Sequence, residues 1–410
     1  MKILLIAYAC EPGRGSELGT GWNMSLGLAK THDLTVVTRA NNREKIEDDL
    51  KGYSGPSPRF IYVDPGSWAL RLKKMGVLPV QVFYQLWQMA VAKTLRKADG
   101  NFEIVHQLTF NSFEVPPLAF WRLEGAKIWG PMGGGQTVPR SLLSAFGGKG
   151  GVKEFLRNLR VRLSSWNPLC RGTLRRSSLV LFANQETKQL LGKNCKGRTD
   201  FMIDVGVDIT KFTPREKSTS SDQVVFLFAG RLEGRKGVLL LIRAFEKHAK
   251  ETSNTELRIV GDGPLADCLK EEVGRMDCSD RIVLTGLVSH TEMEHEFARA
   301  DVFSFPSLRD TSGAAVLEAM TMELPVICFD HQGSAIMVSD DCGLKVAAGS
   351  TEEAIDNLSQ AMSDLAGNRE ERVAMGKAGR LRVSGEYDWA SKVSRINLYY
   401  EEFRTAASPD

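Results

Sequence analysis

The chain has no stretch of about 18 consecutive apolar residues, so no membrane-spanning helix is expected. It also has no Cys-x-x-Cys pair, and none of its seven cysteines lies near a histidine at metal-ligand spacing. These absences exclude a zinc site and a disulfide framework, and scattered cysteines in odd number are typical of a reducing compartment. The apolar run Ile3–Ala9 is too short for a signal peptide and predicts a buried first strand. We therefore expect a cytoplasmic protein.

A strong excess of charge is also absent, because the net charge is only +3 over 410 residues. This balance argues against binding of the whole chain to a polyanion, and nucleic acid is not an expected partner. The length suits two domains of about 150–200 residues each. Hydrophobic residues make up 42% of the chain, which is enough to give each domain a core.

Short apolar runs alternate with longer amphipathic stretches in two series along the chain. Apolar strands separated by helices are typical of parallel sheets covered on both faces, so we predict an α/β protein with two doubly wound domains. The expected domains are residues 1–205 and 206–385, joined near a polar, serine-rich stretch within 205–223, with residues 386–410 as a closing helix. The predicted strands are Ile3–Ala9, Leu34–Val37, Phe60–Val63, Ile104–Val105, Lys127–Trp129, Leu179–Ala183, Val224–Ala229, Leu257–Val260, Ile282–Leu284, Val302–Phe305, Pro325–Phe329 and Leu344–Val346.

A glycine-rich turn, which includes Gly15 and Ser16, follows the first predicted strand. Glycines between a strand and a helix let backbone N–H groups approach a phosphate, although a plain tight turn has the same composition. The spacing argues against NAD, because Leu18 occupies the place of the last glycine in a GxGxxG fingerprint. The second strand ends at Arg39 without the acidic residue that would hold a ribose.

The strand Val224–Ala229 runs into Gly230-Arg231, and Lys236 follows five residues after this arginine. Arginine offers a planar fork and lysine a point charge, and both suit phosphate oxygens. Such fixed cations would stabilise the negative charge that develops on a diphosphate as its bond to a sugar breaks. Solvated surface charge is the alternative.

The strand Val302–Phe305 leads through a polar loop into a small-residue helix that is expected to start near Ser312. Its dipole favours an anion at the N-terminus. Asp310 precedes the helix and Glu318 lies within it. Since a buried unpaired charge is costly, sugar and ribose hydroxyls are natural partners for these two acids.

At these positions the chain resembles the family-4 glycosyltransferases, which are retaining enzymes of GT-B fold. The resemblance covers nearly the whole length and rests on the order and spacing of five motifs: Gly230-Arg231…Lys236-Gly237, Gly261-Asp262-Gly263-Pro264, Pro306-Ser307, Asp310…Glu318 and Pro325-Val326. It implies two Rossmann-like domains facing a cleft, with the closing helix crossing back to the first domain. It also implies an acceptor-side first domain and a second domain that binds the nucleotide sugar.

By the resemblance, Arg231 and Lys236 bind the donor diphosphate, Asp310 lies near the transferred sugar, and Glu318 binds the ribose. The expected donor site comprises Gly15, Ser16, Arg231, Lys236, Gly261, Leu287, Asp310, Thr311, Ser312, Gly313, Leu317 and Glu318. The family pattern begins with glutamate where this chain has Asp310, so the reach toward the sugar differs.

His106 ends a predicted strand where family members often carry histidines. It is a candidate catalytic residue or ligand of sugar or acceptor, and the alternative is a core histidine whose hydrogen bonds are satisfied. Gly133 and Gly134 follow the next strand, and glycine at such a place favours close approach of a ligand on the acceptor side.

Residues 149–176 carry eight lysines and arginines against one acid, a local charge of +7. Basic, aromatic, amphipathic segments of this kind can lie on an anionic membrane, here the inner face of the cell membrane, or hold a lipid-diphosphate acceptor. A solvated helix face is an equal alternative.

Together with these features, the resemblance implies a retaining glycosyltransferase that moves a hexose from a nucleotide-diphosphate sugar, with UDP-sugars such as UDP-glucose favoured, to a glycan or lipid-linked acceptor. No Asp-x-Asp occurs in the chain, so neither a metal nor another cofactor is expected. The alternatives are a catalytically silent nucleotide-sugar-binding protein and a GT-B-like epimerase or phosphorylase.

Overall fold

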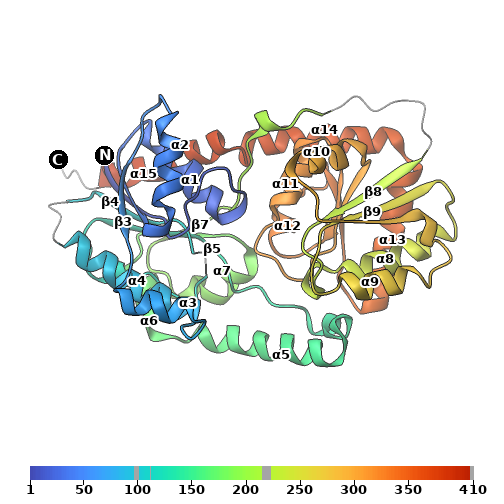
Figure 1. The fold of residues 1–410 in the computed structure, drawn as a ribbon, viewed down its shortest axis with the longest axis horizontal. Coiled ribbons are helices and arrows are strands. Elements are labelled where there is room, and N and C mark those ends of the chain that lie inside the picture. Colours follow the sequence, from blue (N-terminus) through green and yellow to red (C-terminus); the bar gives the residue numbers. More distant parts are fainter. Residues whose placement is uncertain (97–100, 111, 215–222, 407–410) are drawn as a thin grey trace. The chain divides into compact units, whose positions relative to one another are not determined.

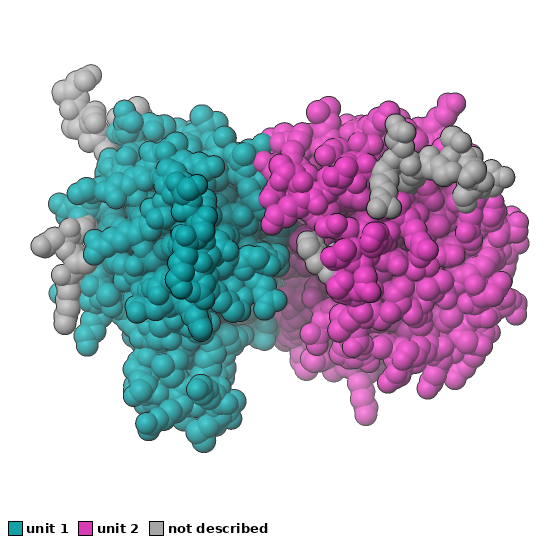
Figure 2. Space-filling view, turned by 45° about the horizontal axis from the view of Figure 1, so that its top comes forward, with its two compact units in different colours: residues 1–135, 160–206, 389–410 teal, residues 136–159, 207–388 magenta. Residues whose placement is uncertain are grey.

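The computed structural model describes residues 1–96, 101–110, 112–214 and 223–406. The chain forms two compact units (Figure 2). Unit 1 comprises Met1–Gly135, Arg160–Gly206 and Trp389–Asp410, and unit 2 comprises Gln136–Leu159 and Val207–Asp388. The serine-rich part of the predicted linker, residues 218–222, lies outside the described residues.

Unit 1 contains a seven-stranded parallel sheet in the order β3-β2-β1-β4-β5-β6-β7. Leu5 pairs with Val36 on one side and with His106 on the other, which places β1 at the centre of the sheet. The strands are β1 Lys2–Ile6, β2 Asp33–Arg39, β3 Arg59–Val63, β4 Ile104–Gln107, β5 Ala126–Met132, β6 Leu179–Phe182 and β7 Arg198–Phe201.

Two apolar clusters cover the two faces of this sheet, because continuous apolar strands bury side chains on both sides. Trp87, Phe113 and Trp129 belong to one cluster, and Trp22 and Tyr400 belong to the other. The helices of unit 1 are α1 Ser16–Ala29, α2 Arg43–Lys51, α3 Ser67–Lys74, α4 Val80–Leu95, α6 Pro168–Arg176, α7 Gln185–Leu191 and α15 Trp389–Ala406.

Unit 2 contains a six-stranded parallel sheet in the order β10-β9-β8-β11-β12-β13. Figure 1 shows α8, α9 and α13 together on one side of the sheet, and α8 packs directly on α13. The strands are β8 Val224–Ala229, β9 Thr255–Val260, β10 Ile282–Gly286, β11 Val302–Phe305, β12 Val326–Phe329 and β13 Gly343–Val346. The helices are α8 Val238–Ala249, α9 Ala266–Val273, α10 His290–Arg299, α11 Ala314–Thr321, α12 Gln332–Met337, α13 Thr351–Gly367 and α14 Arg369–Glu386.

The remaining elements are one helix at a unit boundary and seven short 3₁₀ turns. Helix α5, Gly147–Ser164, is divided between the two units at residues 159 and 160. The turns are η1 Ala40–Asn42, η2 Leu118–Trp121, η3 Arg140–Phe146, η4 Gly192–Asn194, η5 Ile209–Lys211, η6 Gly234–Lys236 and η7 Ser279–Arg281.

The predicted α/β class with two doubly wound sheets is confirmed, and each of the twelve predicted strands corresponds to an observed one. Residues 136–159, which the sequence placed in the first domain, belong instead to unit 2. The reason is packing, since Val138 and Leu142 lie in the core of unit 2 and Glu154 pairs with Arg309. The final helix, α15, belongs to unit 1, where Ile396 and Tyr400 enter the core.

Both sheets reverse their strand order at the central strand, next to β4 in unit 1 and next to β11 in unit 2. In open parallel sheets, the loops at the carboxyl ends of the strands around such a point form the usual ligand site. A ligand site in either unit is therefore expected at the carboxyl ends of these strands.

Candidate donor site

A pocket of about 600 Å³ lies at the carboxyl ends of β8, β9 and β10 in unit 2. Three predicted donor-site residues, Arg231, Gly261 and Leu287, line it together. The side chain of Arg231 is exposed, and Leu287 is 78% exposed although it is apolar. The pocket thus offers a cation and an apolar wall, a combination that suits the phosphates and the base of a nucleotide.

Two glycines of the motifs allow the loops around this edge to touch. Gly261 has φ +135°, and a Cβ there would lie 1.9 Å from the carbonyl oxygen of Gly230. Gly237 has φ +69°, and a Cβ there would lie 1.9 Å from the carbonyl oxygen of Pro306. Any side chain at either position would push the ends of neighbouring strands apart, which explains why the motifs need glycine.

Lys236 and Asp310 form an ion pair on the other side of β8, where β11 ends. Their side chains are only 13% and 18% exposed. Arg235 Nη1 lies 3.5 Å from the same carboxylate oxygen, and the other oxygen accepts a 3.1 Å hydrogen bond from Thr311 N–H. The carboxylate therefore joins two cations from the loop after β8 to the loop after β11.

Neither of the two predicted cations lies in an α-helix. Lys236 lies in the 3₁₀ turn η6, and α8 begins only at Val238 with Gly237 as its N-cap. Arg231 lines the pocket, whereas Lys236 pairs with Asp310, so one loop supplies a cation to each place.

The small-residue helix α11 begins at Ala314 with Gly313 as its N-cap, two residues later than Ser312. Thr311 Oγ1 accepts a 2.7 Å hydrogen bond from Gln136 Nε2, and Ser312 is buried. Glu318 lies in the second turn of the helix and is half-buried. Leu317 has no exposed surface and its side chain packs in the core, so its role as a donor contact stays a prediction.

The glycine-rich turn of unit 1 leads into α1. Gly15 is the N-cap and Ser16 is the first helical residue, and both are exposed. Ser16 has φ +55°, a left-handed conformation that is uncommon for a residue with a side chain. The turn thus presents backbone at the carboxyl end of the central strand β1, where the sequence predicts phosphate contacts.

His106 is fully buried in β4, and both of its ring nitrogens have partners. The carbonyl of Gly130 accepts a hydrogen bond from Nε2 at 2.7 Å, so Nδ1 accepts the hydroxyl hydrogen of Tyr400 at 2.6 Å. Burial lowers the pKa of His106 to about 4, which keeps the ring neutral. The structure therefore supports the alternative, a core histidine whose hydrogen bonds are satisfied, over a catalytic residue or ligand.

Gly133 and Gly134 follow β5, as predicted, but their surroundings are protein. Gly133 is buried and its carbonyl accepts a 3.3 Å hydrogen bond from Phe113 N–H. Gly134 has φ +95°, and a Cβ there would lie 3.1 Å from Ser112 Oγ. Packing between two segments of unit 1 therefore accounts for both glycines without a ligand.

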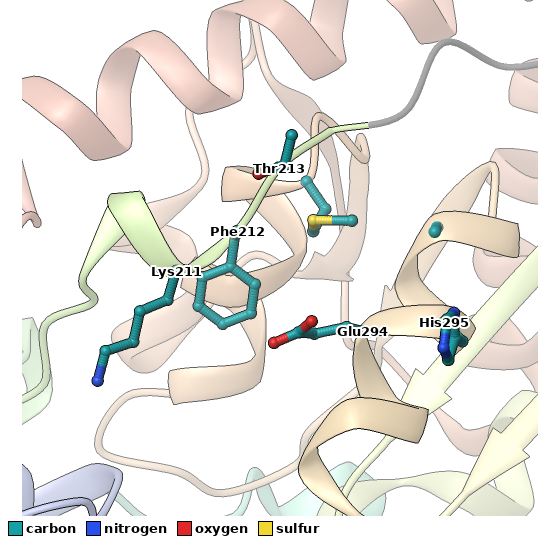
Figure 3. A pocket seen from close by; sticks show the side chains of 7 residues that line it. Lys211, Phe212, Thr213, Glu294 and His295 are labelled. Carbon is teal, nitrogen blue, oxygen red and sulfur yellow. The ribbon is translucent and has the colours of Figure 1, made fainter.

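A second pocket of unit 2, of about 160 Å³, is smaller than the usual site for a ligand the size of a nucleotide sugar. Figure 3 shows Glu294 extending toward the ring of Phe212, whereas Lys211 points away from both. None of the motif residues lines this pocket. We do not assign it to the donor.

Sequence reasoning missed Arg235, which reaches Asp310, and Val288 and Met293, which line the larger pocket. Arg235 stands beside Lys236 in the motif, so its position was a usable signal. Val288 and Met293 carried no such signal, because isolated apolar residues are equally common in a core.

Comparison with known proteins agrees with this architecture. Residues 210–382 match the family model of the glycosyl transferases group 1. A GDP-mannose-dependent alpha-(1-6)-phosphatidylinositol monomannoside mannosyltransferase from Mycolicibacterium smegmatis is 25% identical over 77% of this chain and 88% of its own length.

Among solved structures, sucrose-phosphate synthase from Thermosynechococcus elongatus superposes with a TM-score of 0.66 at 18% identity, covering 99% of both chains. Anabaena HepE in complex with UDP superposes with a TM-score of 0.62 at 16% identity, covering 98% of this chain and all of that one. At these identities the two structures speak for the fold alone.

The two doubly wound sheets, the motifs and these relatives define the chain as a glycosyltransferase of GT-B fold. Within that class, residues 210–382 are similar to the group 1 glycosyl transferases. The family that the motifs indicated is thereby confirmed.

Proposed function

We propose that the protein is a retaining hexosyltransferase that moves mannose or glucose from a nucleotide-diphosphate sugar to a glycan or lipid-linked acceptor, in the synthesis of a polysaccharide or glycolipid. The observation that carries the proposal is the division of the loop after β8, which gives Arg231 to the 600 Å³ pocket and Lys236 to the cluster with Asp310. A donor lying along this edge would place its nucleotide in the pocket and its sugar near Asp310.

In the proposed reaction the bond between the anomeric carbon and the donor phosphate breaks, and the acceptor oxygen bonds to that carbon. The acceptor proton passes to the leaving phosphate on the same face, so the anomeric configuration is retained. Negative charge grows on the diphosphate as it leaves, and Arg231 and Lys236 would stabilise that charge without a metal ion. Asp310 would hold sugar hydroxyls and Glu318 the ribose.

The donor nucleotide is the first point to test. The sequence favours a UDP-sugar, whereas the mycobacterial relative is named for GDP-mannose. Thermal shift with UDP-glucose, GDP-mannose and the bare nucleotides would rank them, because a ligand that binds only the folded protein raises its stability by about 2.7 kcal/mol at 100 times Kd. NMR of the product would then report the anomeric configuration.

The outcomes of this test separate the alternatives. Transfer with retention supports the proposal. Donor binding without product for any acceptor class would favour a silent binding protein, and release of a sugar phosphate or an isomerised donor would favour a phosphorylase or an epimerase.

We also propose that residues 149–176 contact an anionic membrane surface, where a lipid-linked acceptor would lie. Exposed apolar side chains gather there, namely Val152, Phe155, Leu156 and Leu159 in unit 2 and Leu163, Trp166 and Leu169 in unit 1. The single acid, Glu154, turns inward to Arg309 at 3.1 Å and leaves the exposed side basic. No helix in the described ranges is long and apolar enough to cross a bilayer.

Flotation with phosphatidylglycerol vesicles would test this contact. Leu156→Gln with Trp166→Gln should reduce binding, while Leu381→Gln, at a leucine of α14 that is more exposed than Leu156, should not. Equal binding of all three proteins, or equal binding to neutral phosphatidylcholine vesicles, would count against the proposal.

A further inference from the structure

The side chain of Gln332, the first residue of α12, makes hydrogen bonds to the loop that carries Asp310. Gln332 Oε1 accepts a 2.6 Å hydrogen bond from the backbone N–H of Asp310. Its Nε2 donates to the carbonyls of Leu308 and Thr137, both at 3.2 Å. One side chain thus joins the two peptide groups that precede Asp310 to the carbonyl of Thr137.

Gln332 occupies a backbone conformation that does not suit it. Its φ is +61°, in the left-handed region that glycine adopts freely, and the residue is only 5% exposed. Gly333 follows directly, and a Cβ there would lie 1.9 Å from the carbonyl of Thr311. A strained backbone conformation persists only where the surrounding contacts hold it in place. At Gln332 this conformation places the side chain so that it makes its three hydrogen bonds.

The geometry points to Gln332 as a positioning residue for Asp310. We propose that it fixes the backbone at residue 310 and, through the backbone, the direction of the carboxylate. Glycine would adopt this backbone conformation with less strain, and glutamine occupies the position because transfer requires its hydrogen bonds to the loop. Gln332 acts on transfer through Asp310 and does not itself contact the donor. The inference rests on the proposed function, in which Asp310 holds the transferred sugar.

Two substitutions separate positioning from stability. Gln332→Gly removes the side chain and relieves the backbone, whereas Gln332→Ala removes the same hydrogen bonds and keeps the strain. If the role is positioning, both variants should lower kcat by about 100-fold, a loss typical of a misplacement of about 1 Å. The donor KM and the affinity for the bare nucleotide diphosphate should change by less than about threefold, because the pocket at Arg231 is intact.

A merely structural role predicts a different pattern, in which activity follows stability and Gln332→Gly is clearly more active than Gln332→Ala. Glu323→Gly is the matched control, because Glu323 also has a left-handed backbone, φ +59°, and lies at the opposite end of α11 from Asp310. It should keep full activity. If Gln332→Gly also kept full activity, the inference would be overturned.

A crystal structure of the Gln332→Gly protein without donor completes the test. Asp310 should be displaced or lose its contact with Lys236, and an unchanged Asp310 would also overturn the inference. This readout does not depend on activity. If the wild-type protein transferred no hexose from any nucleotide sugar, the proposed function would fail, while the position of Asp310 would still decide whether Gln332 holds it.

Discussion

The carboxylate of Asp310 pairs with the cations Lys236 and Arg235 and accepts a hydrogen bond from Thr311. Replacing Asp310 with asparagine separates the ion pairs from the hydrogen bond. The substitution keeps the size of the side chain and an oxygen that can accept the 3.1 Å hydrogen bond from Thr311 N–H. It removes the charge that faces Lys236, and it also leaves Arg235, 3.5 Å away, without this partner. Losses in stability, nucleotide binding and transfer should therefore differ.

The stability loss follows from the burial of the pair. Removing one partner of a fully buried ion pair typically costs about 3–5 kcal/mol. Here the side chains keep 13% and 18% exposure, and the remaining hydrogen bond offsets part of the loss, so we expect about 2 kcal/mol. For a unit of this size that corresponds to a decrease of roughly 4–8 °C in Tm.

A double-mutant cycle in urea unfolding measures the pair itself. Asp310→Asn, Lys236→Met and the double variant should show a coupling of at least about 1 kcal/mol, since the residues are in direct contact. Titration calorimetry with UDP and GDP should find nucleotide binding to Asp310→Asn unchanged or tighter, because Lys236 is released for the diphosphate. Transfer should fall by at least about tenfold. Additive stability losses, or weaker nucleotide binding with unchanged transfer, would refute this reasoning.

Four further predictions concern the rest of the site and the core. Arg231→Ala should lower turnover by at least about tenfold, measured by product formation. Glu318→Gln should weaken the binding of both the bare nucleotide and the intact donor by about 1–3 kcal/mol, measured by calorimetry. Transfer should continue in excess EDTA, and activity that required added magnesium or manganese would disprove the cation argument. His106 has a folded pKa of about 4 against 6.5 in the unfolded chain, so its share of stability is present above pH 6.5 and is lost as the pH falls toward 4. That share is roughly 3 kcal/mol, and urea unfolding of His106→Asn should show a flatter acid limb than the wild type.

The parallel sheets were predictable because their strands are continuous apolar runs. Short runs of this kind, separated by helices, are typical of strands that are buried on both faces of a sheet. The one observed strand that the pattern missed among the described residues is β7, Arg198–Phe201. It lies at the edge of the sheet and pairs only with β6. Its Asp200 accepts a hydrogen bond from Tyr399, so its polar residues are satisfied by side chains of α15 rather than by burial among strands.

The places of Arg231, Lys236 and Asp310 in loops after strands were predictable, because each belongs to a motif that follows an apolar run in the sequence. Long-range packing decided the rest. His106 ends a strand as expected, but Tyr400, 294 residues away, occupies one of its ring nitrogens. Gln332 is invisible as a site residue from the sequence, because nothing in a single glutamine indicates that it contacts the peptide of Asp310.

The position of the central strand explains why one short loop can serve two purposes in unit 2. Strand β8 lies between β9 and β11, so the loop that follows it has the pocket on one side and the Asp310 cluster on the other. Gly261 and Gly237 allow the backbone to close against both neighbours. On the proposed function, the four residues between Arg231 and Lys236 then span the donor from its nucleotide to its sugar. Lengthening this loop by one residue should uncouple the two, leaving nucleotide binding in place while transfer is lost.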